Sequence, residues 1–181
     1  MRRHCWFPDN TVLCNFAAVD RLSLLEKVLD GRGRWTQAVA AEAGRSARYW
    51  PKLEQVAVGG WLGEPVEIDD PAEVALVDRV RRVVFAGSAS RPLQHLGEAE
   101  TLVVIEHRAE FADSVWITDD GEAGHYARRK GIHVKDTVGL MREAVVDGLI
   151  MADTGHSLLL DMERAGRYLR GVPHRPADLL R

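Results

Sequence analysis

The sequence has few cysteines and no long uncharged apolar run. Only Cys5 and Cys14 are present, which is too few for a disulfide framework, and we expect both to be reduced, small and buried. The longest apolar runs, such as residues 101–105, are far shorter than the roughly 18 to 20 residues that cross a bilayer. A polar break at Pro8–Asn10 interrupts the stretch that a signal peptide would need. We therefore expect a cytoplasmic protein that does not enter a membrane.

Several common signatures of nucleotide and metal binding are also missing. Neither G-x-x-x-x-G-K-[ST] nor G-x-G-x-x-G occurs, so a P-loop or a Rossmann fingerprint is unsupported. The seven histidines lack the spacing of a zinc site, and no G-x-S-x-G elbow indicates a serine hydrolase. The net charge of −3 argues against binding nucleic acid through bulk positive potential. Carboxylates remain as the main candidates for chemistry.

Short apolar runs alternate with helical patterns along the chain. Strands are predicted at His4–Phe7, Ser114–Thr118 and Ile132–Val134, without hairpin turn signals between them. Strands separated by helices pair in parallel through right-handed crossovers, which predicts an α/β fold: a three-layer α/β/α sandwich with a central, mostly parallel sheet. We expect residues 1–150 to form this domain and residues 151–181 to add a C-terminal helix and tail that pack on it.

Proline, glycine and capping residues divide the remaining chain into helices and loops. We expect residues 56–68 to be a glycine-rich loop with at most a short strand near its end, and the tail after Arg170 to be loose. A short strand is expected near residues 34–36. Helices are expected as a pair within 11–29, and at 38–50, 70–84, 97–107, 121–130, 136–146 and 153–168.

Acidic residues follow two of the predicted strands. Asp9 follows the first, and Asp119 and Asp120 follow a later one, so parallel pairing would place them at the sheet edge where such folds bind ligands. Hard divalent cations prefer carboxylate oxygens, which favours a magnesium or manganese site. Each acid alone also fits a helix cap or a first-turn position. Asp9 is the exception, because an uncompensated charge behind an apolar strand is costly.

Four segments together resemble a known family: Phe7–Leu13, Ala38–Glu42, Gly97–Glu100 and Trp116–Asp120. Their order, spacing and acidic motifs are similar to those of PIN domains over about residues 6–150. The closest likeness is to the branch with a G-E-x-E helix start and a D-D pair. PIN domains are metal-dependent ribonucleases, many of them VapBC-type toxins. The resemblance therefore implies a Mg²⁺- or Mn²⁺-dependent endoribonuclease with RNA as substrate and an antitoxin protein as partner.

The resemblance also implies roles for individual acids. Glu98 and Glu100 lie roughly 200° apart around a helix and cannot easily share one metal; Glu98 is favoured because it lies on the face of Leu102 and Ile105. Glu42 or Asp120 would position the attacking water. The implied catalytic residues are Asp9, Glu42, Glu98 and Asp119, and the implied metal ligands are Asp9, Glu98, Asp119 and Asp120.

Alternatives remain for the acids and for the arginines. A module that keeps the fold but has lost its metal would bind RNA or protein without catalysis. A phosphoacceptor domain is disfavoured, because its acidic pair would follow the first strand.

Arginine accounts for 20 of the 24 basic residues, and its fork suits phosphate, although codon bias explains most of them equally well. Candidates for the RNA backbone are Arg45, Arg48, Arg128 and Arg129; each also fits a solvated helix face.

Two apolar segments bear on association. Thr11–Leu29 and Leu158–Met162 contain more apolar positions than one buried stripe ordinarily uses. If some are exposed, we expect a two-fold homodimer. The alternative is that both segments complete the core.

Overall fold

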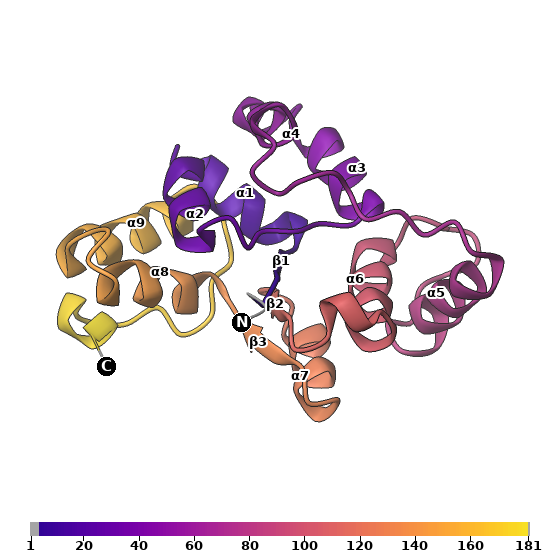
Figure 1. Ribbon diagram of the computed structural model, residues 1–181. Helices are drawn as coiled ribbons and strands as arrows, with labels where there is room; N and C mark the ends of the chain where they lie inside the picture. Colours follow the sequence, from indigo (N-terminus) through magenta and orange to yellow (C-terminus); the bar gives the residue numbers. More distant parts are fainter. Residues whose placement is uncertain (1–3, 181) are drawn as a thin grey trace.

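A computed structural model describes residues 4–180, and a parallel sheet lies at its centre (Figure 1). Its three strands are β1 (Trp6–Pro8), β2 (Val115–Ile117) and β3 (His133–Lys135), in the order β1-β2-β3. Phe7 pairs with Trp116, which in turn pairs with Val134. The predicted adjacency of the first and central strands is therefore confirmed.

Two isolated parallel bridges continue the sheet beyond the free side of β1. Trp6 pairs with Gly33, and Thr36 pairs with Val66. These single bridges stand where short strands were expected near residues 34–36 and 65–68. Gly33 allows this close packing, because a Cβ atom there would lie 2.6 Å from a methyl group of Leu62.

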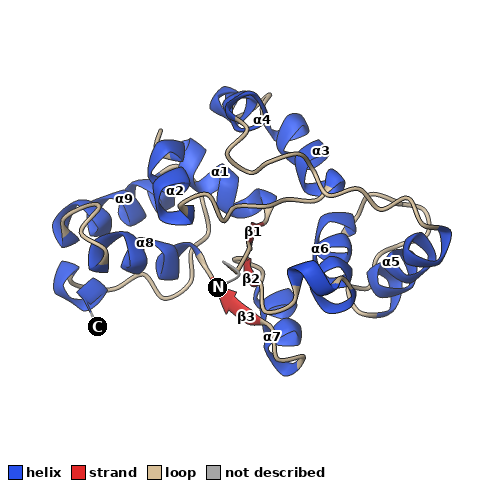
Figure 2. Ribbon diagram, in the orientation of Figure 1, coloured by secondary structure: helices blue, strands red, loops and turns tan. Residues whose placement is uncertain are grey.

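Helices lie on both sides of the strands (Figure 2). The short 3₁₀ segments are η1 (Pro51–Leu53), η2 (Ala109–Phe111) and η3 (Pro176–Leu180). The α-helices are α1 (Asn10–Ala18), α2 (Leu22–Leu29), α3 (Gln37–Ser46), α4 (Glu54–Gly59), α5 (Pro71–Val83), α6 (Leu96–His107), α7 (Gly121–Arg129), α8 (Thr137–Val146) and α9 (Ala152–Arg164). None of the helices between residues 4 and 180 is long and apolar enough to span a membrane.

Alternation along the strands divides the core into two parts. Successive strand residues point to opposite faces of a sheet. Trp6, Val115 and Ile117 accordingly pack in one cluster with residues of α1, α2, α8 and α9. Phe7 and Trp116 pack in a second cluster with residues of α6 and α7. This arrangement is the predicted three-layer sandwich.

Helix α4 extends into the segment expected to be a glycine-rich loop. Its residue Val56 is buried in the core, as is Leu62 just after it. Gly60 ends the helix in the left-handed conformation, with φ of 63°. Burial of these two apolar side chains outweighs the low helix propensity of the glycines, so the loop prediction is wrong for the first part of this segment.

The prediction of a loose C-terminal tail is also wrong. The tail forms η3, which packs on α8 and α9, and Leu179 lies fully buried in the main core. Gly155 of α9 makes room for it, because a Cβ atom there would lie 3.3 Å from Leu179 Cδ1. The His156 ring also forms a hydrogen bond of 2.8 Å with the carbonyl of Pro173.

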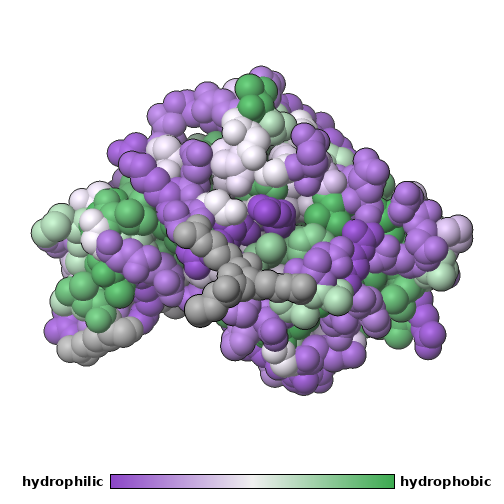
Figure 3. All heavy atoms as spheres, viewed as in Figure 1, coloured by the Kyte–Doolittle hydropathy of each residue, from purple (hydrophilic) through white to green (hydrophobic). Residues whose placement is uncertain are grey.

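The apolar segments that suggested a homodimer are mostly buried within the chain. Nearly all apolar side chains of Thr11–Leu29 belong to the main core, and so do Leu158, Leu159 and Met162. On the face shown in Figure 3, apolar residues form separate patches between hydrophilic ones. Both segments therefore complete the core. The expectation that some of their apolar side chains are exposed, on which the homodimer rested, is wrong. Cys14 is buried, Cys5 is half-buried, and both are free thiols.

Leu179→Ala tests whether the tail is part of the core. We expect it to lower the free energy of unfolding by about 2–4 kcal/mol, because it leaves a cavity against α8 and α9. Leu180 is the matched control, since it is 60% exposed, and Leu180→Ala should cost less than about 0.5 kcal/mol. Urea denaturation followed by circular dichroism measures both. Equal effects of the two variants would contradict the packing of η3.

Candidate active site

Two buried aspartates follow adjacent strands at the carboxyl edge of the sheet. Asp9 comes directly after β1, and its backbone N–H donates to the carbonyl of Ile117 at 2.9 Å, which ties it to β2. Asp119 comes two residues after the end of β2. Their exposed fractions are only 8% and 9%. Parallel pairing thus brings together two acids that lie far apart in the sequence, as the order of strands and helices predicts.

Asp9 combines a helix cap with a strongly perturbed carboxyl group. Its Oδ1 accepts a hydrogen bond of 2.9 Å from the backbone N–H of Val12, which caps α1. Burial raises the pKa of Asp9 to about 8, and the charges of Asp119 and Glu98 add to this rise. Hydrogen bonds from Thr118 and Val12 oppose it without cancelling it. The site therefore holds a carboxylate that lacks enough positive charge nearby.

Asp119 is held by donors from two other parts of the chain, and a third part steadies one of these donors. Thr137 donates from its backbone N–H to Oδ1 at 3.0 Å and from its hydroxyl to Oδ2 at 2.6 Å. Asn15 donates to Oδ2 at 2.8 Å and itself accepts from Nε of Arg167 at 2.7 Å. Burial raises the pKa of Asp119, and the charge of Asp136 adds to the rise, whereas Thr137 and Arg167 oppose it. The carboxylate is thus fixed in orientation.

Glu42 and Glu98 bring two further carboxylates to this edge. Glu42 lies on α3 and accepts a hydrogen bond from the backbone N–H of Gly97 at the start of α6. A Cβ atom at Gly97 would lie 3.1 Å from Glu42 Oε1, so the glycine permits this close approach. Burial raises the pKa of Glu42 to about 7, and the charge of Glu98 is the next largest cause. Glu98 also interacts with the charge of Asp9 and lies 3.3 Å from Nδ1 of His95.

Glu100 has a different role from Glu98. Its Oε2 accepts a hydrogen bond of 2.9 Å from the backbone N–H of Ala38, and its side chain also bonds to Thr36, so it satisfies the start of α3. The two glutamates do not face one site, as their separation around the helix predicts. Of the two, the geometry favours Glu98 as the acid beside Asp9.

Asp120 lies at the rim and acts as a helix cap. It is exposed, and its Oδ1 accepts from the backbone N–H groups of Glu122 at 2.8 Å and Ala123 at 2.9 Å. Asp120 is therefore the N-cap of α7, a role that the sequence already allowed for one of the two paired aspartates. Asp119 is the inward-facing member of the pair.

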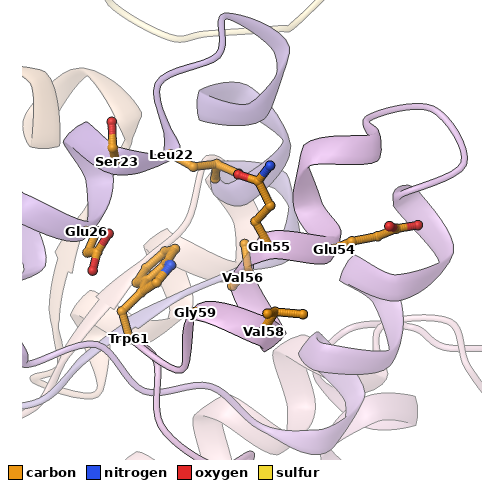
Figure 4. Close-up of a pocket in the computed structure, with 9 residues that line it drawn as sticks. All are labelled: Leu22, Ser23, Glu26, Glu54, Gln55, Val56, Val58, Gly59 and Trp61. Atoms are coloured by element: carbon orange, nitrogen blue, oxygen red, sulfur yellow. The ribbon is translucent and has the colours of Figure 1, made fainter.

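Two open cavities adjoin Asp119. The larger has a volume of about 570 Å³, and Thr11, Asp119, Arg167 and Arg170 contribute to its wall. The smaller, of about 290 Å³, also includes Arg128. A third cavity of about 470 Å³ lies between α2 and α4 and contains none of the candidate acids (Figure 4). The two cavities at the sheet edge, which contain Asp119, are therefore the candidate substrate sites.

A family model described as a PIN domain matches residues 5–172. The chain belongs to the PIN domain family. No curated protein and no solved structure gives a significant match. The match confirms the family resemblance and the predicted fold, and it places the strand-edge acids in a nuclease-type fold.

The described acids of this PIN domain do not form a complete metal-binding site. Within residues 4–180, no three His, Cys, Asp or Glu side chains are grouped so that they could hold a metal ion. Instead the acids interact in pairs: Asp9 with Asp119 and with Glu98, and Glu42 with Glu98. Magnesium commonly takes one or two carboxylates and completes its octahedron with waters and substrate phosphates. Carboxylate oxygens are hard donors, so this donor set fits a hard divalent cation.

The four arginines proposed as RNA contacts differ in their surroundings. The guanidinium carbon of Arg48 lies 4.6 Å from the ring centre of Tyr49, and that of Arg129 lies 5.4 Å from the ring centre of Tyr126. Arg45 lowers the pKa of Glu42 through its charge. Arg128 lines the smaller cavity. Arg45 and Arg128 therefore lie near the acids.

Sequence reasoning missed several residues that support the acids. Asn15 carried a signal, because it is a polar residue within the apolar run Val12–Ala17. Asp136 and Thr137 belong to a stretch, residues 136–140, that also resembles the family, but neither was assigned a role at the site. Arg167 gave no signal, because it reaches the site from beyond the last helix.

We expect the metal-free PIN domain to lose stability as the pH rises from about 4 to about 8. Asp9 and Glu42 have ordinary pKa values of 3.8 and 4.5, and folding raises these to about 8 and about 7. The folded state therefore binds more protons than the unfolded chain across this window, so its free energy of unfolding falls with rising pH. At ~1.4 kcal/mol per pKa unit, the loss amounts to several kcal/mol. Urea denaturation in EDTA across this pH range measures it.

Asp9→Asn provides the comparison, because asparagine caps a helix as well as aspartate does but carries no charge. We expect this variant to flatten the pH profile and to be more stable than the wild type near pH 8. Asp70→Asn is the control, since Asp70 caps α5 outside the site, and it should leave the profile unchanged. A profile as steep in Asp9→Asn as in the wild type would contradict the assignment.

Proposed function

We propose that this PIN domain is a metal-dependent endoribonuclease that hydrolyses phosphodiester bonds of RNA. The single observation that carries the proposal is the gathering of Asp9, Glu42, Glu98 and Asp119 at the carboxyl edge of β1 and β2. Burying like charges side by side is costly, and a cation at this edge would offset the cost. The nuclease-type fold of the family supports the same interpretation.

In this proposal, Mg²⁺ or Mn²⁺ binds between Asp9 and Asp119, and Glu98 and Asp120 add oxygens once the bound cation draws these side chains closer. Such a cation neutralises charge on a phosphate and lowers the pKa of a coordinated water. Asn15 and Thr137 keep the Asp119 carboxylate in one orientation through their hydrogen bonds.

Glu42 is suited to receive the proton of the attacking water. Its pKa of about 7 lies close to neutral pH, where a general base works most effectively. The backbone N–H of Gly97 holds the carboxylate in place, and the charge of Arg45 favours its ionised form. Asp9, by contrast, is fixed by the start of α1 and serves as a ligand.

The resemblance to VapBC-type toxins supports a finer proposal. We propose that the chain is the cytoplasmic toxin of a toxin-antitoxin module and that an antitoxin covers the acidic edge when the toxin is inactive. Induced expression of the wild type should then arrest growth, and Asp9→Asn should not. Growth of both cultures at equal rates, with equal protein levels, would contradict the toxin role and leave the nuclease proposal intact.

The nuclease proposal predicts which acids are needed for cleavage. Asp9→Asn, Glu42→Gln, Glu98→Gln and Asp119→Asn should each lower the rate of RNA cleavage by at least ~100-fold, because each removes a ligand or the base. Glu100→Gln should instead lower stability with little direct effect on the rate, since it contacts the start of α3. Cleavage of a labelled structured RNA in Mg²⁺ or Mn²⁺, together with melting curves of every variant, separates the two outcomes.

The control variant is Glu110→Gln, an exposed acid in η2 away from the carboxyl edge. It should cleave at the wild-type rate. Wild-type protein that binds RNA but does not cleave it with either metal would favour the alternative function, a PIN-like RNA- or protein-binding module without catalysis.

Metal binding itself predicts a change in stability. Millimolar Mg²⁺ or Mn²⁺ should raise the melting temperature of the wild type, because a ligand that binds only the folded state stabilises it by mass action. Asp9→Asn should melt higher than the wild type without metal and should respond less to it. Identical responses of the wild type and Asp9→Asn would exclude Asp9 as a ligand.

A further inference from the structure

The larger cavity beside Asp119 has a second wall that the proposed mechanism does not use. This wall is the segment Gly166–Arg170, which follows α9. In Figure 1 the segment, coloured yellow, passes beside α1 before the chain returns along α8 to η3. The cavity measures about 570 Å³, within the range of small-ligand sites. Acids thus line one side of the cavity, and arginine and tyrosine line the other.

The backbone of this segment is held in place on both sides of Tyr168. Arg167 donates from Nε to Oδ1 of Asn15 at 2.7 Å, the same Asn15 that donates to Asp119. Leu169 is buried in the main core. Between these two fixed residues, Tyr168 is 75% exposed. An aromatic ring presented on a fixed backbone costs little entropy when it binds a ligand.

Arg170 lies against the start of α7 and beside the Tyr168 ring. A Cβ atom at Gly121 would lie 1.5 Å from Nη1 of Arg170, so the guanidinium occupies the space beside the glycine backbone. The guanidinium carbon is 6.0 Å from the centre of the Tyr168 ring. Arg170 lines both cavities that contain Asp119. It forms no hydrogen bond or ion pair with the part of the chain that the structure describes, so its donors are available.

We propose that Tyr168 and Arg170 form a nucleotide-binding subsite next to the acids. The Arg170 guanidinium binds the RNA phosphate adjacent to the one that is cleaved, and an unpaired base stacks on the Tyr168 ring. Guanidinium groups bind phosphate oxygens through two parallel hydrogen bonds, and exposed aromatic rings stack on bases of single strands. The proposal rests on the proposed ribonuclease function, because it places the neighbouring phosphate at Asp119.

Stacking of a base on the Tyr168 ring requires a single-stranded RNA substrate. Bases within an RNA duplex are stacked on one another and cannot reach a protein ring, whereas bases of single strands can. The subsite therefore selects unpaired RNA at the position beside the cut. A structured RNA would be cleaved in its loops rather than in its stems.

The chain offers a matched control pair for this subsite. Tyr49 is 66% exposed and is stacked by Arg48 at 4.6 Å, but it lines neither cavity that contains Asp119. Tyr49→Ala thus removes an exposed tyrosine elsewhere on the surface, and Arg82→Gln removes an exposed arginine of α5 that lines neither cavity. The test measures fluorescence anisotropy of a labelled oligouridylate in EDTA, where no cleavage occurs, with the four variants and the wild type.

We expect Tyr168→Ala to weaken oligouridylate binding roughly tenfold, whereas Tyr49→Ala leaves it unchanged. Arg170→Gln should weaken binding and should reduce the slope of log affinity against log salt by about 0.7, the share of one phosphate on a single strand. Arg82→Gln should not change that slope. A fully paired RNA duplex should bind more weakly than the oligouridylate, and Tyr168→Ala should not affect duplex binding.

Three results would overturn the subsite: no binding of oligouridylate by the wild type, equal effects of the two tyrosine variants, or equal effects of Tyr168→Ala on single-stranded and paired RNA. The binding readout also separates the subsite from the nuclease proposal. If the wild type binds as expected but never cleaves, the subsite stands and the nuclease proposal fails. If the wild type cleaves with metal and Tyr168→Ala cleaves with an unchanged KM, the nuclease proposal stands and the subsite fails.

Discussion

Burial of like charges at the end of two parallel strands is the constraint around which the rest of this PIN domain is arranged. Asp9 and Asp119 both lie almost out of contact with solvent, and each has a raised pKa because burial disfavours its charged form. Such charges stay ionised only where donors or cations compensate them. The hydrogen bonds from Val12, Thr118 and Thr137 provide part of that compensation. In the proposed function, a divalent cation supplies the remainder.

The network around Asp119 connects parts of the chain that the sheet does not join. Asn15 of α1 donates to Asp119 and to the Thr137 hydroxyl at the start of α8, and it accepts from Arg167 beyond α9. An asparagine can do this because its amide presents both donors and an acceptor. The C-terminal segment is thereby tied to the acidic edge, and its fixed position allows Tyr168 and Arg170 to face the cavity of Asp119.

The sequence was sufficient for the parts of the fold that depend on pattern and order. Alternating strands and helices predicted parallel pairing, and this alone placed Asp9 and Asp119 at one edge. It was insufficient where isolated contacts decide the outcome. Leu179 orders the tail by burying one side chain, and Val56 and Leu62 hold α4 and its exit despite their glycine neighbours. Neither effect produces a periodic pattern. The side-chain network around Asn15 depends on tertiary distances, which a sequence does not contain.

The acids at the strand ends show why sequence alone could not separate a helix cap from a ligand. Asp9, Asp120 and Asp136 each follow a strand closely and cap the helix that comes next. One carboxylate oxygen bonds to the helix N-terminus, whose partial positive charge stabilises the anion. The cap therefore supplies a fixed carboxylate at the edge where ligands bind, and the two roles are compatible. What distinguishes the residues is burial: Asp9 caps α1 from inside the protein, whereas Asp120 caps α7 in contact with solvent. Burial raises the pKa of Asp9 to about 8, and in the proposed function a divalent cation would favour its ionised form.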